Sequence, residues 1–213
     1  MKGVFVTGTG TEVGKTVVAA AIARTLASGG LRVSVFKPAV TGLEEPGEAD
    51  HQLLRRAAGS TQSDEEIAPY RYGPPASPHL AAALAGEEID PERLLAAARA
   101  SGGEELVCEG VGGLLVPLAD GYLVRDLAVD LGLPLVVAAS PGLGTINHTL
   151  LTLEAARGAG LEVAAVVLTP WPQRPGEIER SNRETIASVG RVEVKTLPPL
   201  DLAEPGSWPA LSC

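Results

Sequence analysis

Apolar residues in this chain fall into short β-branched runs that alternate with longer segments whose apolar positions recur at helical spacing. The short runs predict strands at residues 4–6, 31–36, 105–108, 133–139, 163–168 and 192–194. The longer segments predict helices at residues 17–26, 50–58, 78–85, 91–100, 126–131 and 177–188, and one that ends near 157. This alternation predicts an α/β fold with a mostly parallel central sheet and helices on both faces.

The length of the chain favours one structural unit. With 213 residues it can bury a substantial core, and no linker rich in Gly and Ser divides it. We therefore expect residues 1–213 to form a single domain. No apolar run reaches the roughly 18 to 20 residues that a membrane span needs, and the start of the sequence has no signal-peptide pattern. These features predict a cytoplasmic protein without a membrane partner.

Charge and cysteine usage argue against several classes of function. The formal net charge is −9, whereas proteins that bind the phosphate backbone of nucleic acids normally present a basic face. We therefore expect no nucleic-acid partner. Cys108 and Cys213 are far apart in the sequence, which predicts neither a disulfide framework nor a cysteine metal cluster. Cys108 lies within an apolar run, so we expect it to be a small core residue.

The segment Gly8–Thr16 connects the first predicted strand to the first predicted helix, and its sequence is typical of a P-loop. In such a loop, backbone N–H groups and the helix N-terminus face phosphate oxygens. Lys15 would reach the β- and γ-phosphates, and the Thr16 hydroxyl would bind Mg²⁺. Gly8 and Gly14 enclose five residues, where the usual pattern has four. The alternative is an ordinary glycine-rich turn, but the flanking strand and helix favour a P-loop NTPase-like fold.

Other polar residues follow predicted strands, namely Lys37, Glu109 and Ser140. Because parallel strands place their carboxyl ends at one edge of a sheet, we expect these residues near the phosphate loop. Glu109 is placed to hold Mg²⁺ on bound phosphates, the alternative being a charge that faces water. Lys37 is placed to stabilise a transferring phosphoryl group, the alternative being a solvated strand end. Asp50 has a weaker case, because a helix N-cap role explains it equally well.

Two further segments are candidates for function. The polar segment 59–78 is too long for a simple connector, and long loops in compact domains are often functional. The segment 142–147 precedes a helix and offers N–H groups to an anion, although a plain strand-to-helix turn explains it almost as well. No serine–histidine–carboxylate order and no metal-ligand spacing supports hydrolase or zinc chemistry.

Together, these motifs resemble the dethiobiotin synthetase family of P-loop enzymes. The resemblance rests on residues 6–16 (VTGTGTEVGKT), Phe36-Lys37-Pro38, Ser77-Pro78-His79, Glu109-Gly110-Val111-Gly112-Gly113 and Gly144-Thr145-Ile146-Asn147-His148. Their order and spacing hold from the N-terminus to about residue 170. The additional residue in the phosphate loop is itself characteristic of this family.

The resemblance implies an ATP- and Mg²⁺-dependent cyclisation of 7,8-diaminononanoate with carbon dioxide, which gives dethiobiotin for biotin biosynthesis. Lys15 and Lys37 would stabilise a carbamate and the migrating phosphoryl group. The residues that would hold Mg²⁺ are Thr16, Asp50 and Glu109.

The resemblance also implies where the organic substrates bind. Thr11, counted with the two lysines as catalytic, and Thr41 would contact the diamine or its carbamate. The family works as a homodimer, and the carboxylate tail of the substrate would reach the partner subunit. The residues of that anion site would be Gly144, Thr145, Ile146 and Asn147. The nucleotide would be bound by Glu12, Val13, Gly14, Lys15, Thr16, Val17, Asp50, Glu109, Gly110, Val111, Gly112, Thr169, Pro170, Pro198, Pro199 and Leu200.

Two segments depart from the family pattern. Where family members usually have an Asn that recognises adenine, this chain has Thr169 followed by Pro170, which leaves adenine selection open. The turn at residues 198–200 resembles the family's base-contacting turn only weakly.

A nucleotide-driven switch of the chromosome-partitioning or division-site type shares this fold and is the alternative function. Those proteins usually carry a second lysine early in the P-loop, where this chain has Gly10 and Thr11, and many end in a basic amphipathic helix. The proline-rich tail of this chain cannot form such a helix. A third candidate, an amidating ligase of cobalamin synthesis, needs a glutaminase domain for which 213 residues leave no room.

Overall fold

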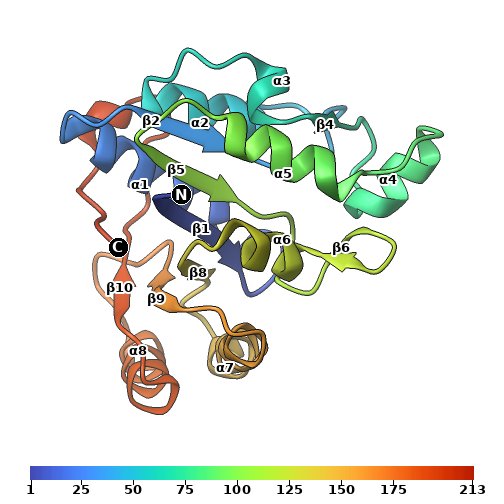
Figure 1. Ribbon diagram of the computed structural model, residues 1–213. Coiled ribbons are helices and arrows are strands. Elements are labelled where there is room, and N and C mark those ends of the chain that lie inside the picture. Colours follow the sequence, from blue (N-terminus) through green and yellow to red (C-terminus); the bar gives the residue numbers. More distant parts are fainter.

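The computed structural model describes residues 1–213 and contains one six-stranded parallel sheet with the strand order β10-β9-β8-β1-β5-β2 (Figure 1). The strands of this sheet are β1 (Gly3–Gly8), β2 (Val33–Phe36), β5 (Glu105–Glu109), β8 (Leu135–Ala139), β9 (Val163–Leu168) and β10 (Val194–Thr196). Strand β1 therefore lies inside the sheet, between β5 and β8. The predicted α/β fold with a parallel sheet is confirmed.

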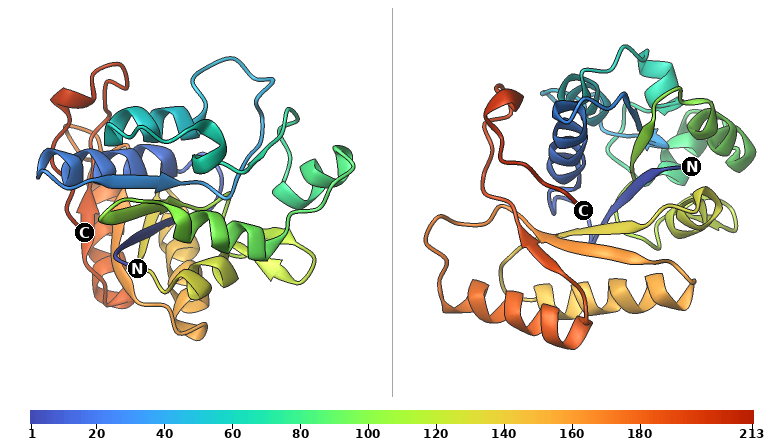
Figure 2. Two further views of the ribbon diagram at one scale, coloured as in Figure 1. Left: turned by 45° about the horizontal axis from the view of Figure 1, so that its top comes forward. Right: turned by 60° about the vertical axis from the view of Figure 1, so that its left-hand side comes forward.

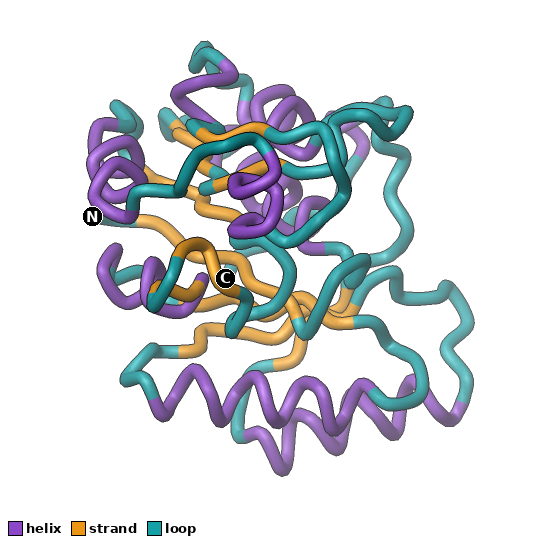
Figure 3. The backbone as a smooth tube through the Cα atoms, turned by 90° about the vertical axis from the view of Figure 1, so that its right-hand side faces the viewer, coloured by secondary structure: helices purple, strands orange, loops and turns teal.

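Helices cover both faces of the sheet. They are α1 (Lys15–Ser28), α2 (Asp50–Ala58), α3 (Asp64–Ile67), α4 (Pro78–Leu84), α5 (Pro91–Ala100), α6 (Val124–Leu131), α7 (Thr145–Gly158) and α8 (Glu177–Gly190). Successive strand residues point to opposite faces, so Val4 and Val6 pack with α1 and α2, whereas Phe5 packs in the core beneath α5 and α6. Helices α7 and α8 contact each other and lie at the lower edge of Figure 3.

Several short elements were not predicted. Part of the segment 59–78, predicted to be a loop, forms α3 and the strand β4 (Tyr70–Arg71), which pairs with β3 (Ala39–Val40). The hairpin β6 (Pro117–Ala119) and β7 (Tyr122–Leu123) was also missed. Pairs of two or three residues are too short to give an alternating apolar pattern. The last strand begins at Val194, two residues later than predicted.

After β10, the chain turns back along α1 toward the edge of the sheet where β2 begins. This segment contains the short 3₁₀ helix η1 (Pro205–Ser207) and runs beside α1, as the right-hand view of Figure 2 shows in red and blue. No helix in the structure combines the length and apolar character that a bilayer crossing requires. Both cysteines are free thiols, and Cys108 is fully buried as predicted.

Candidate active site

The phosphate loop connects the end of β1 at Gly8 to the start of α1 at Lys15. Gly14 caps the helix with φ 84°, a left-handed conformation that favours glycine. A Cβ atom at this position would lie 2.5 Å from the Cγ2 methyl of Thr169, so a larger residue requires the Thr169 side chain to move. The Lys15 ammonium folds back over the loop and donates to the Gly10 carbonyl at 2.7 Å.

Lys37, Asp50, Glu109 and Thr16 meet beside this loop. The Lys37 ammonium lies 2.7 Å from Asp50 Oδ2 and 2.7 Å from Glu109 Oε1. The Thr16 hydroxyl is 3.0 Å from Asp50 Oδ1 and 2.8 Å from Glu109 Oε1. Lys37 and Glu109 are 3% and 0% exposed, which excludes the alternatives of a solvated strand end and a water-facing charge. The expected gathering of polar residues at one sheet edge is present.

The alternative that Asp50 is a helix cap is wrong. Helix α2 begins at Asp50 itself, and its N-cap is Ala49, whose side chain makes no cap hydrogen bond. The carboxylate of Asp50 instead points to Lys37 and Thr16. The start of α2 therefore serves to bring a second carboxylate to the phosphate loop.

The environment shifts the pKa values of these groups. Burial lowers the pKa of Lys15. Burial would also lower the pKa of Lys37, but the carboxylates of Glu109 and Asp50 outweigh it and raise the pKa. Burial raises the pKa of Glu109, and the attraction of Lys37 only partly offsets this. For Asp50, the influence of Lys37 exceeds that of burial, so the pKa is lowered. Lys37 is thus a fixed cation between two acids.

The donor set here fits Mg²⁺ bound to a nucleotide. Glu109 Oε2 is buried and has no hydrogen-bond partner, which leaves one carboxylate oxygen free for a cation. The Thr16 hydroxyl lies 3.0 Å from Asp50 Oδ1 and 2.8 Å from Oε1 of the same Glu109 carboxylate, so the three groups are neighbours. The site supplies only two carboxylates, and no group of three or more His, Cys, Asp or Glu side chains forms a metal site made of protein ligands alone. Mg²⁺ typically takes one or two carboxylates and completes its shell with waters and substrate phosphates.

A cleft of about 870 Å³ opens at this edge, between the phosphate loop and the segments 39–49 and 75–78. Its lining includes Thr11, Glu12, Gly14, Lys15, Thr16, Val17, Lys37, Thr41, Asp50, Glu109, Val111 and Gly112, all expected to belong to the site. The prediction missed Ala76 and Val116, because small apolar residues carry no sign of a site in the sequence.

Other predicted site residues do not line this cleft. Thr169 lies against Gly14, and Leu200 packs against the apolar cluster that Val13 and Val17 also join. Thr169 therefore borders the phosphate loop on the β9–β10 side. The residues Gly110, Ser140, Gly144, Thr145, Ile146, Asn147, Pro170, Pro198 and Pro199 also lie outside the lining of the cleft.

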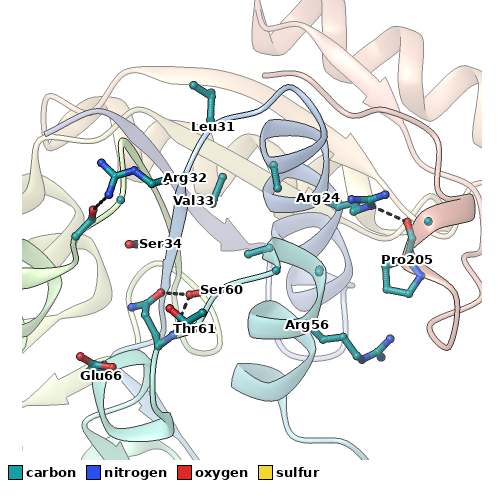
Figure 4. A pocket seen from close by; sticks show the side chains of 18 of the residues that line it. Arg24, Leu31, Arg32, Val33, Ser34, Arg56, Ser60, Thr61, Glu66 and Pro205 are labelled. Atoms are coloured by element: carbon teal, nitrogen blue, oxygen red, sulfur yellow. Dashed lines mark hydrogen bonds between the residues drawn. The ribbon is translucent and has the colours of Figure 1, made fainter.

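A second cavity of about 940 Å³ lies at the opposite edge of the sheet, where β2 begins and α1 and α2 end (Figure 4). It is larger but contains none of the predicted site residues. Its arginines are already engaged: Arg32 lies near Glu104, Arg56 bonds Glu48, and Arg24 bonds the Pro205 carbonyl. The smaller cleft, by contrast, is lined by the residues that the sequence predicts for the site.

Comparisons with known proteins identify the family and the fold of the chain. A family model described as an AAA domain matches residues 2–205. A protein of Anaeromyxobacter dehalogenans strain 2CP-1 is 48% identical over 171 residues, which cover 79% of this chain and 76% of that protein. A protein of Rhodococcus erythropolis strain PR4 is 42% identical over 92% of this chain and 87% of its own length. One from Bacillus subtilis strain 168 is 36% identical over 93% and 87%.

All three relatives carry the name ATP-dependent dethiobiotin synthetase BioD. Among solved structures, the signal recognition particle receptor FtsY of Elizabethkingia anophelis matches with a TM-score of 0.55 and 14% identity. The match covers 99% of this chain and 62% of the receptor. At this identity, the likeness concerns the fold alone.

Proposed function

The chain belongs to the dethiobiotin synthetase family, and we propose that it closes the ureido ring of dethiobiotin from 7,8-diaminononanoate, carbon dioxide and ATP. The observation that carries this proposal is the meeting of two lysines, two carboxylates and the Thr16 hydroxyl at the mouth of a phosphate loop. The reaction belongs to biotin biosynthesis, and the protein acts in the cytoplasm.

The chemistry divides into three steps. One amine of the diamine attacks carbon dioxide and loses a proton, giving a carbamate. A carbamate oxygen attacks the γ-phosphorus of ATP, and the bond to the β–γ bridging oxygen breaks to release ADP. The second amine attacks the carbonyl carbon of the resulting carbamic–phosphoric anhydride, and phosphate leaves as the ring closes.

Two lysines stabilise the charge that moves in these steps. Lys15 binds the terminal phosphates, for which it gives up its bond to the Gly10 carbonyl. Lys37 stays protonated because its pKa is raised, so it acts as a positive clamp on the carbamate and the transferring phosphoryl group and not as a base. Thr16, Asp50 and Glu109 would hold Mg²⁺, which would supply positive charge to the nucleotide phosphates.

The remainder of the cleft receives the diamine. Its walls at Val40, Ala76, Val111 and Val116 offer apolar surface to an alkyl chain. Thr11 and Thr41 supply hydroxyl groups to the reacting nitrogens. The carboxylate tail of the substrate extends to Gly144–Asn147 of the partner subunit in a homodimer. The absence of a side-chain cap at the start of α7 supports this: the Thr145 N–H donates to the Gly142 carbonyl, but no side chain occupies the N–H groups of Ile146 and Asn147, which could donate to an anion.

The experiment that tests the proposal supplies the purified protein with the diamine, ¹³C-bicarbonate and Mg-ATP. Mass spectrometry should find dethiobiotin with one labelled carbon, and one phosphate released for each ring. Reactions that lack either the diamine or bicarbonate are the controls. ATP turnover that ignores the diamine and responds to a protein partner would instead favour the chromosome-partitioning type of switch.

A further inference from the structure

The C-terminal segment 198–213, here called the tail, is irregular yet firmly attached to the fold. Trp208 is 9% exposed and Leu211 is 5% exposed, and both belong to the core cluster built on α1. The indole N–H of Trp208 donates to the Asp201 carbonyl at 2.7 Å. One aromatic side chain therefore joins the first part of the tail to the helix that carries the phosphate loop.

Polar contacts hold the tail at further points. Arg56 at the end of α2 donates to the Leu202 carbonyl at 2.8 Å. Arg24 on α1 donates to the Pro205 carbonyl at 3.3 Å, as Figure 4 shows. The Leu211 N–H donates to the Thr25 hydroxyl at 2.8 Å. Each bond satisfies a backbone group of a segment that has almost no secondary structure of its own.

The tail begins at the end of β9, one residue from the side chain that packs against the phosphate loop. The Leu197 N–H donates to the Leu168 carbonyl at 3.0 Å, which joins the tail's start to the end of β9. The next residue after β9, Thr169, has its methyl group against Gly14 of the loop. The start of the tail therefore forms, together with Thr169, a wall on the β9–β10 side of the loop, and Leu200 packs against the apolar cluster that runs along α1.

The strand order determines what this wall can bind. The cleft for the second substrate lies on the β5–β2 side of β1, next to Lys37. The terminal phosphate of a bound nucleotide must face that side, so the nucleoside leaves the loop toward β9 and β10. There the prolines at 170, 198 and 199 offer apolar surface to a base.

We propose that Trp208 is a positioning residue for ATP: by fixing the tail on α1, it holds residues 198–200 against the nucleoside while making no contact with the phosphates. The orientation of the nucleotide rests on the proposed function, whereas the role of Trp208 rests on the contacts that hold the tail of this chain in place. A nucleotide binds only the fraction of molecules whose tail is docked, so a looser tail lowers its apparent affinity by that fraction.

The experiment compares two ligands that share the phosphate loop, Mg-ATP and magnesium tripolyphosphate, by titration calorimetry. We expect Trp208→Ala to weaken the binding of ATP by about tenfold or more, because a smaller fraction of molecules has a docked tail. The binding of tripolyphosphate should weaken by less than about twofold. Trp208→Phe keeps the buried ring and should recover most of the ATP affinity. In steady state, the KM for ATP should rise, while the KM for the diamine and kcat stay within about twofold.

Equal weakening of both ligands would overturn the proposal, because it would mean general damage to the fold, and so would an unchanged affinity for ATP. Arg56→Ala loosens the tail from a different helix and keeps the test decisive if Trp208→Ala does not fold. Arg99→Ala is the matched control, because Arg99 also donates to a backbone carbonyl, that of Asp130, far from the tail. The binding comparison needs no turnover, so it stands even if no dethiobiotin forms.

Discussion

Replacing Lys37 with Met tests whether this buried cation stabilises the fold as well as the reaction. The methionine keeps most of the aliphatic stem but removes the ammonium that lies 2.7 Å from each of two carboxylate oxygens. Glu109 is then left fully buried with only the Thr16 hydroxyl as its partner, and Asp50 faces it without an intervening positive charge. The substitution therefore measures the free-energy cost of placing two carboxylates side by side without a cation between them.

The structure sets the size of this effect. Removing one partner of a buried ion pair costs about 3 to 5 kcal/mol. The side chain of Asp50 is 44% exposed, so water screens part of its repulsion, and we expect the lower end of that range, about 3 kcal/mol. For a chain of 213 residues, this corresponds to a fall in Tm of roughly 6 to 12 °C.

Urea denaturation of the wild type, Lys37→Met, Glu109→Gln and the double variant measures this effect as a double-mutant cycle. We expect Glu109→Gln to recover most of the stability that Lys37→Met loses. The loss should also be smaller in mildly acidic than in mildly alkaline buffer, because Glu109 takes up a proton when its partner is absent. Lys2→Met, at an exposed position, is the control. A loss below about 1 kcal/mol, or additive effects in the cycle, would refute the reasoning.

The remaining predictions concern neighbouring residues. Lys37→Met should lower dethiobiotin formation by about 100-fold or more with ATP affinity nearly unchanged, because a transition-state clamp acts on rate; affinity lost in parallel would make Lys37 an ordinary phosphate binder. Because the pKa of Asp50 is lowered in the folded state from its usual value of 3.8, the ionised carboxylate stabilises the fold above pH 3.8, and this stabilisation is lost as the pH falls through the lowered pKa. Between pH 5 and 2.5, the free energy of unfolding of Asp50→Asn should therefore fall by less than that of the wild type. Gly14→Ala should cost roughly 1 to 2 kcal/mol of stability, and adding Thr169→Ser should recover part of it by removing the methyl group; an Ala that costs nothing would show that the loop adapts.

The sequence predicted the sheet and the phosphate-loop side of the site because both depend on local signals. Glycines before Lys15 and β-branched runs before Lys37 and Glu109 determine which residues end the strands, and parallel pairing then brings those ends together. The same reasoning placed Cys108 in the core. Periodicity and turn chemistry within about ten residues were sufficient for these features.

Features that depend on distant packing were not predicted. Local sequence alone left a helix-cap role for Asp50 as plausible as a site role, because its partners Lys37 and Thr16 are 13 and 34 residues away along the chain. Trp208 lies in a proline-rich tail whose composition gives no sign that it is buried on α1. The apolar walls of the cleft were missed for the same reason, since Val116 becomes a site residue only through the loop that carries it.

The interior place of β1 also bears on how the protein is made. Its two neighbours are strands that begin more than one hundred residues later, and the Thr9 N–H that opens the phosphate loop donates to the Ala138 carbonyl. At a synthesis rate of about 5 to 20 residues per second, the first strand and its glycines wait on the ribosome for roughly 6 to 26 s before that partner is translated. An apolar strand exposed for so long invites wrong pairing, so we expect the nascent chain to depend on chaperones until about two thirds of it has emerged.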